Sequence, residues 1–221
     1  MKKAILLGVC AILLLSLLTG CGKGGDSEII IDKSQTKKVS FGEWKDKTFV
    51  SRWLGLTFAL PDKMSSASAE ELKNTFQIGE DSVINEGAEL SEEILADEQI
   101  CYYYDLKLKD GGGTLCCCLY YFDTQKKLGA QLSSANYALN LREALTAKGC
   151  ELTESERALI AGRDYIRFEA SLNQYVKNVY YIGKCEGITV IWITAEYTGQ
   201  TPSVSEFING IMSYETSNDK N

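Results

Sequence analysis

The residue with the clearest chemical assignment in this chain is Cys21, which ends the tetrapeptide LTGC at positions 18–21. A thiol is a nucleophile that can accept a diacylglyceryl group, and the small residues Thr19 and Gly20 let an extended backbone enter a protease. This pattern is typical of a lipoprotein signal-peptidase site. It predicts cleavage between Gly20 and Cys21 and lipid attachment at Cys21. Two acyl chains hold a protein on a membrane stably, whereas a single chain binds only marginally.

The residues before this motif have the composition of an export signal. Lys2 and Lys3 make a short positive start, and residues 4–18 are apolar and carry no charge. As a helix these residues span roughly 22 Å, less than the roughly 30 Å hydrocarbon core of a bilayer. We therefore expect residues 1–20 to be a signal peptide, and the mature chain to be anchored on the extracytoplasmic face of the cell membrane. The alternatives are an uncleaved anchor helix and an ordinary secretory signal followed by a chance cysteine.

The remaining cysteines and the lack of histidine limit the chemistry of the mature chain. The sequence contains no histidine, which excludes Ser-His-Asp catalysis, Cys-His catalysis and histidine-containing metal sites. With Cys10 and Cys21 set aside, the cysteines are Cys101, Cys116, Cys117, Cys118, Cys150 and Cys185. None belongs to a CxxC pair, and consecutive strand residues point to opposite faces, so residues 116–118 cannot converge on one metal. We expect free thiols in the core and on the surface; the alternatives are one long-range disulfide and a metal site.

No motif gathers reactive side chains for catalysis. The glycines at 111–113 lie between two predicted strands, whereas a phosphate-binding loop precedes a helix. We therefore expect no catalytic residue, no cofactor and no bound metal, and we do not expect an enzyme.

Charge is distributed unevenly along the chain. Without residues 1–20 there are 21 basic and 30 acidic residues, a net charge of −9 that argues against nucleic acid as a partner. No basic residue lies between Lys73 and Lys107, where the acids are Glu80, Asp81, Glu86, Glu89, Glu92, Glu93, Asp97, Glu98 and Asp105. This segment is either a solvated face or a surface that docks a basic partner or binds Ca²⁺ loosely.

Tyrosines are a second group of candidate binding residues. Those on predicted strands are Tyr102, Tyr103, Tyr104, Tyr120, Tyr121, Tyr180 and Tyr181. Because they occur in adjacent runs, each strand must turn some of them away from the core. We expect helices to cover that face; the alternative is an exposed tyrosine-rich recognition surface.

The chain divides into a tether, one folded region and a short tail. Residues 21–46 are rich in Gly, Ser and charge and predict a lipidated, flexible tether with a reach of roughly 28 Å. Within the tether, Ile29–Ile31 predicts a short strand added to the edge of the domain, or a segment that binds a partner. Residues 47–214 predict a single domain, and residues 215–221 a disordered tail.

The hydrophobic pattern of the folded region mixes strands and helices. Predicted strands cover 48–51, 56–60, 103–109, 114–122, 166–172, 175–182 and 188–197, and predicted helices cover 68–76, 133–148 and a C-terminal segment with Val204, Phe207, Ile208, Ile211 and Met212. Ser68 and Glu71 form a capping box. In the strand 103–109 we expect Asp105 and Lys107 on the polar face. The fold class is therefore α+β, an antiparallel sheet flanked by helices.

Three stretches carry a resemblance to a known family: GLTFALPDKM (55–64), CYYYDLKLKDGGG (101–113), and AGRDYIRFEA with VYYIGKCEGITVIWIT (161–194). They resemble small uncharacterised lipoproteins of Gram-positive bacteria that have a PsbP-like fold, an antiparallel sheet between helices. PsbP itself is an extrinsic photosystem II subunit, and a nuclear-import protein that binds the GTPase Ran shares this architecture. The resemblance implies a fold and a non-enzymatic binding role. No catalytic residue and no photosystem role is carried over.

Together these observations predict a membrane-anchored binding or interaction module whose partner is a protein or a small ligand. The alternative is an accessory envelope lipoprotein that docks a basic partner or Ca²⁺ through the acidic segment.

Overall fold

The structure, a computed structural model, describes residues 39–87, 89–197 and 204–214 and contains two β-sheets and five helices in these ranges. The large sheet contains β4 (Met64–Ser66), β5 (Ser82–Ile84), β6 (Tyr102–Asp110), β7 (Leu115–Phe122), β8 (Glu151–Leu152), β9 (Glu156–Ile160), β10 (Arg163–Asn173), β11 (Val176–Cys185) and β12 (Ile188–Tyr197). The small sheet contains β1 (Glu43–Lys45), β2 (Thr48–Ser51), β3 (Leu56–Ala59) and β13 (Met212–Ser213). The helices are α2 (Ala69–Phe76), α3 (Glu92–Ala96), α4 (Thr124–Leu128), α5 (Ser134–Ala147) and α6 (Val204–Asn209).

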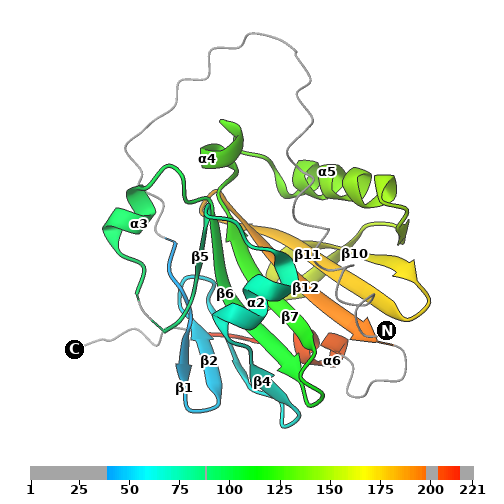
Figure 1. The fold of residues 1–221 in the computed structure, drawn as a ribbon, viewed down its shortest axis with the longest axis horizontal. Coiled ribbons are helices and arrows are strands. Elements are labelled where there is room, and N and C mark those ends of the chain that lie inside the picture. The colour runs from blue at the N-terminus through cyan, green and yellow to red at the C-terminus, as the bar shows by residue number, and fades with distance from the viewer. Residues whose placement is uncertain (1–38, 88, 198–203, 215–221) are drawn as a thin grey trace.

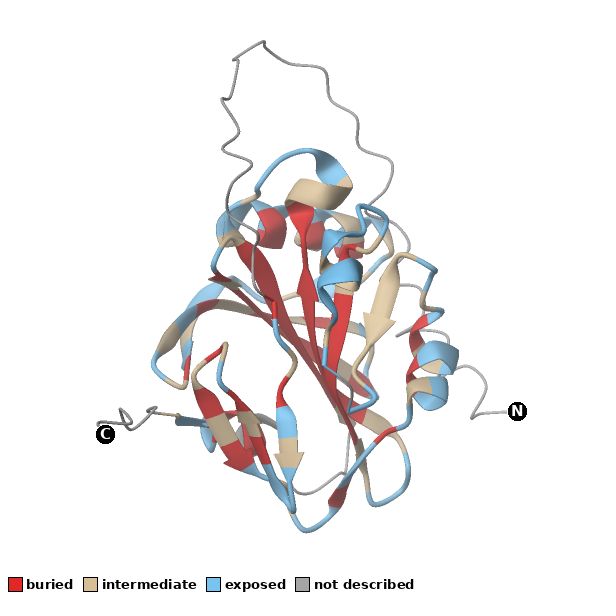
Figure 2. Cartoon of the chain, turned by 90° about the vertical axis from the view of Figure 1, so that its left-hand side faces the viewer, coloured by how far each residue is buried: buried red, intermediate tan, exposed pale blue. Residues whose placement is uncertain are grey.

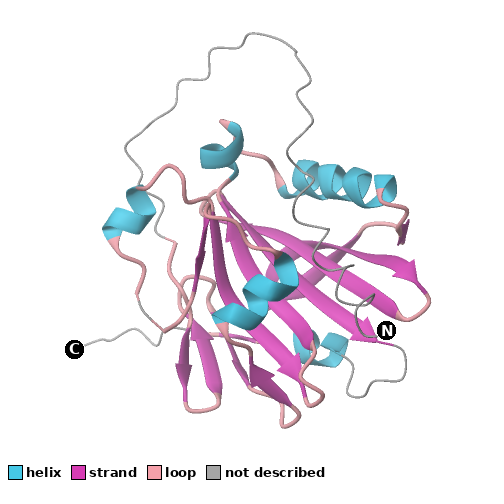
Figure 3. Ribbon diagram, viewed as in Figure 1, coloured by secondary structure: helices cyan, strands magenta, loops and turns pink. Residues whose placement is uncertain are grey.

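The large sheet has the order β4-β6-β7-β12-β11-β10-β8, with β9 paired to β10 and β5 paired to β6. All of these pairings are antiparallel except that of β5 with β6. Helices α2 and α5 cover one face of this sheet, and the small sheet and α6 cover the other (Figure 1, Figure 3). The predicted α+β class, an antiparallel sheet with helices packed on it, is confirmed.

Each face of the large sheet has its own hydrophobic core. On the helical face, Leu72 of α2 and Leu141 of α5 pack with Phe168 and Tyr180. On the opposite face, the stacked rings of Phe49 and Phe58 in the small sheet pack in the same core as Trp192. Figure 2 shows buried residues along the middle of the large sheet and in the small sheet.

Local signals predicted most of these elements correctly. At the start of α2 the Glu71 N–H donates to Ser68 Oγ (3.2 Å) and the Ser68 N–H donates to Glu71 Oε2 (2.7 Å), which confirms the capping box. The turn between β6 and β7 is closed by Asp110, whose Oδ1 accepts the backbone N–H groups of Gly112 and Thr114 (2.9 and 2.8 Å). The long central strands and α5 also lie where the hydrophobic pattern placed them.

The tyrosines of the strands are covered from both sides, so the exposed recognition surface is not present. Buried tyrosines are Tyr103, Tyr104, Tyr120, Tyr121, Tyr180 and Tyr181, and Tyr102 is half-buried. The prediction that helices cover these residues is correct for one face. The small sheet, whose role the sequence did not indicate, covers the other.

The folded region begins before residue 47, so the predicted tether 21–46 is too long. Val39 is only 4% exposed, and Phe41 and Trp44 pack against the core beneath the small sheet. Three apolar side chains outweigh the Gly, Ser and charged residues that suggested a linker. The predictions for residues 1–38 (signal peptide, Gly20–Cys21 cleavage, lipidation at Cys21, a strand or binding segment at Ile29–Ile31) and for the tail 215–221 concern residues outside the described ranges.

The predicted C-terminal helix is shorter than expected. Helix α6 ends at Asn209. Met212, which was predicted to be helical, lies in β13, pairs with Thr57 of β3 and is 62% exposed. Gly210 is a poor helix former, and the open edge of β3 offers backbone partners to the residues that follow. In the described part of the chain, no helix has the length and apolar character needed to cross a membrane.

Candidate functional site

The candidate site lies at the edge of β6, where two short strands leave a gap. β4 pairs with one end of β6 and β5 with the other. At the gap the Asn85 N–H donates to Tyr104 O (2.7 Å) and the Ala67 N–H donates to Lys107 O (2.9 Å). Residues 105–107 of β6 therefore face the segments that enter and leave the two short strands.

A β-bulge places an acidic side chain at this gap. Tyr104 pairs with Tyr120 and Leu106 with Leu119, so Asp105 is an extra residue on β6. A bulge re-aims the side chain of the extra residue. Asp105 is only 3% exposed, which corrects its assignment to the polar face of the strand and to the acidic surface.

The carboxylate of Asp105 is surrounded by donors from three separate parts of the chain. The Gly42 N–H donates to both oxygens (2.9 and 3.0 Å), Asn85 Nδ2 donates to Oδ1 (2.8 Å), and the Tyr121 hydroxyl makes a short hydrogen bond to Oδ2. Burial raises the pKa of Asp105 to about 6, and these hydrogen bonds oppose the rise. The four contacts use its acceptor capacity, so Asp105 positions the surrounding chain and has no free lone pair for a substrate proton.

Gly42 is required at its position by a close approach of the backbone to an aromatic ring. A Cβ on Gly42 would lie 2.2 Å from Cζ of Phe49, which is fully buried. The Gly42 carbonyl accepts from Asn85 Nδ2 (3.0 Å) while its N–H donates to Asp105. Asn85 and Asp105 thus bind both backbone groups of Gly42 and fix the segment before β1 against the large sheet.

Lys107 is the second charged residue buried at the gap. It is 6% exposed, and its Nζ donates to Asn85 O (2.5 Å). Burial lowers its pKa, and the charges of Glu86 and Asp105 oppose this. In the described ranges no carboxylate lies within ion-pair distance of this ammonium. Its assignment to the polar face of the strand is therefore wrong as well.

A pocket of about 1060 Å³ opens over these residues. Apolar walls come from Val39, Phe41, Trp44, Ala67 and Leu90. The polar and charged lining residues are Ser40, Glu43, Lys45, Arg52, Ser66, Ser68, Asn85, Glu86, Glu89, Asp105 and Lys107. A mixed lining of this kind with a few buried polar groups suits a small ligand or a short segment of a partner.

Most of the acidic segment is a solvent-exposed surface around this pocket and beyond it. The exposed acids are Glu80, Glu86, Glu89, Glu92, Glu93, Asp97 and Glu98, and Asp81 is half-buried in an ion pair with Lys127 (2.9 Å). In the described residues no three Cys, Asp or Glu side chains are placed to hold a metal ion.

The cysteines of the described chain form no disulfide and lie mostly in the core. Only Cys150 is half-buried, whereas Cys101, Cys116, Cys117, Cys118 and Cys185 are buried. Burial raises the pKa of Cys101 and of Cys116 to about 12. A thiol with a raised pKa is a weak nucleophile, so these side chains offer no reactive centre.

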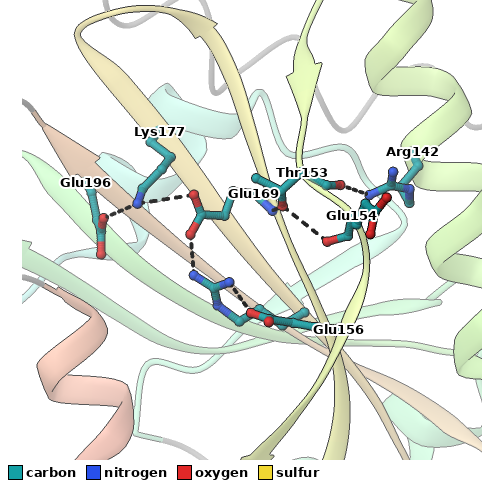
Figure 4. A network of polar contacts seen from close by, with 8 residues as sticks. Arg142, Thr153, Glu154, Glu156, Glu169, Lys177 and Glu196 are labelled. Atoms are coloured by element: carbon teal, nitrogen blue, oxygen red, sulfur yellow. Dashed lines mark hydrogen bonds and ion pairs between the residues drawn. The ribbon is translucent and has the colours of Figure 1, made fainter.

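A second charged cluster lies across β9 to β12 and is neutralised within itself. Arg167 pairs with Glu156 and Glu169, and Lys177 Nζ lies 3.3 Å from Glu169 Oε2 and 2.9 Å from Glu196 Oε2 (Figure 4). Because each cation already has carboxylate partners, this ladder stabilises neighbouring strands and leaves no unpaired cation for a ligand.

Sequence reasoning missed the residues that build the pocket. Gly42 and Trp44 fell in the predicted tether, and Asn85 had no motif around it. Lys107 alternates with leucines as an exposed strand residue does. No local signal shows that a distant segment covers that side of the strand.

No family model matches the chain, and no curated protein matches it. Among solved structures it is similar to the solution structure of cyanobacterial PsbP (CyanoP) from Synechocystis sp. PCC 6803, at a TM-score of 0.40 and 11% sequence identity. The match covers 89% of this chain and 99% of that protein. A TM-score of 0.40 is too low to transfer a site or an activity between the two proteins.

Proposed function

We propose that this protein is a lipoprotein, anchored through Cys21 on the extracytoplasmic face of the cell membrane, that binds a ligand or partner in the pocket at the edge of β6. The observation that carries the binding proposal is the pocket itself, whose floor contains the buried Lys107 and the fixed Asp105. Because the acceptors of Asp105 are occupied and the buried thiols have raised pKa values, the site supports binding and not catalysis.

The anchoring part of the proposal rests on the sequence. The positive start, the uncharged apolar stretch and the LTGC motif occur in the order of a lipoprotein precursor. A Cys21→Ala variant should accumulate as an unprocessed precursor without lipid label. Normal processing and labelling of that variant would contradict the anchor.

Site-directed photocrosslinking in the native cell tests the binding part. A photoreactive phenylalanine analogue in place of Trp44, which lines the pocket, should give a defined adduct. The matched control is the same analogue at Leu139, which is 54% exposed on α5 and outside the pocket. Equal capture at both positions, or no adduct at Trp44, would contradict a binding role for the pocket.

A second candidate function is that of an accessory envelope lipoprotein that docks a basic partner through its acidic surface. One observation favours it. Lys126 donates to Leu95 O of helix α3, and Lys127 pairs with Asp81, so the exposed acids Glu92 and Glu93 project from a helix that is held against the sheet. This function predicts an association that salt weakens and that Glu92→Gln with Glu93→Gln reduces. The control, Glu143→Gln on the exposed side of α5, should leave the association unchanged.

A further inference from the structure

Two lysines in the described part of the chain, the buried Lys107 and the half-buried Lys126, differ in how many hydrogen-bond acceptors surround their ammonium groups. The Lys126 ammonium donates to Leu95 O (2.8 Å), Asp97 O (2.8 Å), Ile100 O (3.1 Å) and Tyr103 Oη (3.0 Å). The more deeply buried Lys107 donates to one acceptor, Asn85 O. The fold therefore surrounds the Lys126 ammonium with four acceptors and gives the Lys107 ammonium a single acceptor.

An ammonium group has three N–H donors, so two donors of Lys107 have no acceptor among the residues that the structure describes. A buried charge with too few hydrogen-bond partners costs free energy, and Lys107, which lines the pocket, has only Asn85 O. The neighbouring Asp105 is turned toward Gly42 and Tyr121 and does not form an ion pair with it. An anion or acceptor that enters the pocket from outside would supply the missing partners of Lys107.

We infer that the pocket binds a small amphiphilic anion, whose carboxylate head pairs with the Lys107 ammonium and whose apolar body lies against Phe41 and Trp44. This inference rests on the proposed binding role of the pocket and names the class of ligand. Phe41 and Trp44 are half-buried and line the pocket together with Leu90, which gives the apolar body of the ligand a wall to cover.

The charges around the pocket favour a monoanion over a phosphate dianion. Lys45, Arg52 and Lys107 line it, but so do Glu43, Glu86, Glu89 and Asp105. A second negative charge on the ligand would meet these carboxylates without a second buried cation to balance it. A carboxylate on an apolar chain needs only the one ammonium.

The test measures the binding of octanoate to the full chain by isothermal titration, with octanol, octylammonium and octyl phosphate as probes of the same chain length. We expect octanoate to bind and the other three to bind at least about tenfold more weakly, because a hydrogen bond to a charged group contributes about 1.5–3 kcal/mol and about 1.4 kcal/mol is tenfold. Lys107→Met should weaken octanoate by about 10- to 100-fold. Lys109→Met is the matched control, because Lys109 lies on the same strand, pairs with Glu71 (2.6 Å) and does not line the pocket.

Thermal unfolding of the same variants separates a binding role of Lys107 from a structural one. Replacing a buried ammonium that has one hydrogen-bond partner and no ion pair with an apolar side chain of similar length removes the cost of burying the charge, so Lys107→Met should unfold at the wild-type temperature or above it. Octanoate that fails to bind the wild type, or that binds Lys107→Met as tightly as the wild type, would overturn the inference. If octanol binds as well as octanoate and Trp44→Ala abolishes both, the pocket binds ligands through apolar contacts; the anion inference then fails while the proposed binding function stands.

Discussion

Asp105 gives a pH-dependent stability that a single substitution can isolate. Its pKa is raised by burial from 3.8 to about 6 in the folded protein, so folding favours the protonated carboxyl. The stabilisation is fully present below about pH 4, where the unfolded chain is also protonated, and is lost as the pH rises through 6. At roughly 1.36 kcal/mol per pKa unit, the difference between 3.8 and about 6 corresponds to about 3 kcal/mol of the free energy of unfolding.

Asp105→Asn is neutral at every pH and has nearly the same shape. Its amide can donate to the Tyr121 hydroxyl, as a protonated carboxyl can, while its oxygen accepts from Gly42 and Asn85. We therefore expect the free energy of unfolding of the wild type to fall by about 2–3 kcal/mol relative to Asp105→Asn between pH 4 and pH 7.5. Most of this fall should occur between pH 4 and pH 6, and the difference should level off above about pH 6.5. Carboxylates elsewhere titrate in both proteins and cancel in the difference.

Urea unfolding of the purified wild type and variant, followed by circular dichroism at half-unit pH intervals, measures this difference. Asp164→Asn is the control, because Asp164 is exposed, pairs with Arg157 and has a lowered pKa. Its difference from the wild type should stay nearly constant between pH 4 and pH 7.5, because the lowered pKa of Asp164 confines its titration to lower pH. Parallel curves for the wild type and Asp105→Asn between pH 5 and pH 7 would refute the argument that the buried carboxyl favours its neutral form.

Three further outcomes follow from local contacts. Gly42→Ala should lower the free energy of unfolding by about 1–3 kcal/mol, because its methyl group meets the ring of Phe49; an unchanged urea midpoint would contradict the close approach. Ser68→Ala should cost about 1 kcal/mol through loss of the α2 cap, whereas Ser65→Ala on an exposed strand position should cost less in the same thermal unfolding experiment. In native protein, brief alkylation followed by peptide mapping should modify the half-buried Cys150 before the buried Cys117; equal rates for the two thiols would show that β7 opens readily.

Sequence patterns predicted the elements whose signals are local. The capping box of Ser68 and Glu71 and the Asp110 turn lie within a few residues of the structure they specify. The central strands were recognised because their apolar residues repeat within each strand. The same reasoning failed for β13, whose partner β3 lies far along the chain. It also missed β1, which pairs with the neighbouring β2 but lies in a segment rich in Gly, Ser and charge.

The candidate site shows the same limit more sharply. Asp105 and Lys107 occupy positions that an exposed strand face would also give to polar residues. They are buried because a bulge turns one of them, and because Gly42 and Asn85 close over the strand edge. A bulge in one strand becomes visible only in the register of its partner, which a single sequence does not contain.

The pairing of β13 with β3 also constrains the order in which this protein can fold. The strands β10, β11 and β12 form consecutive hairpins and can assemble as soon as they are synthesised, whereas the small sheet joins residues near both ends of the described chain. Contacts of such sequence separation form slowly, because a long loop must close first. The core under the small sheet, and with it the wall that carries Phe41 and Trp44, is therefore completed only after the last strand has left the ribosome. A chain cut short before residue 212 would present the apolar face of its large sheet to chaperones and proteases while its hairpins were already formed.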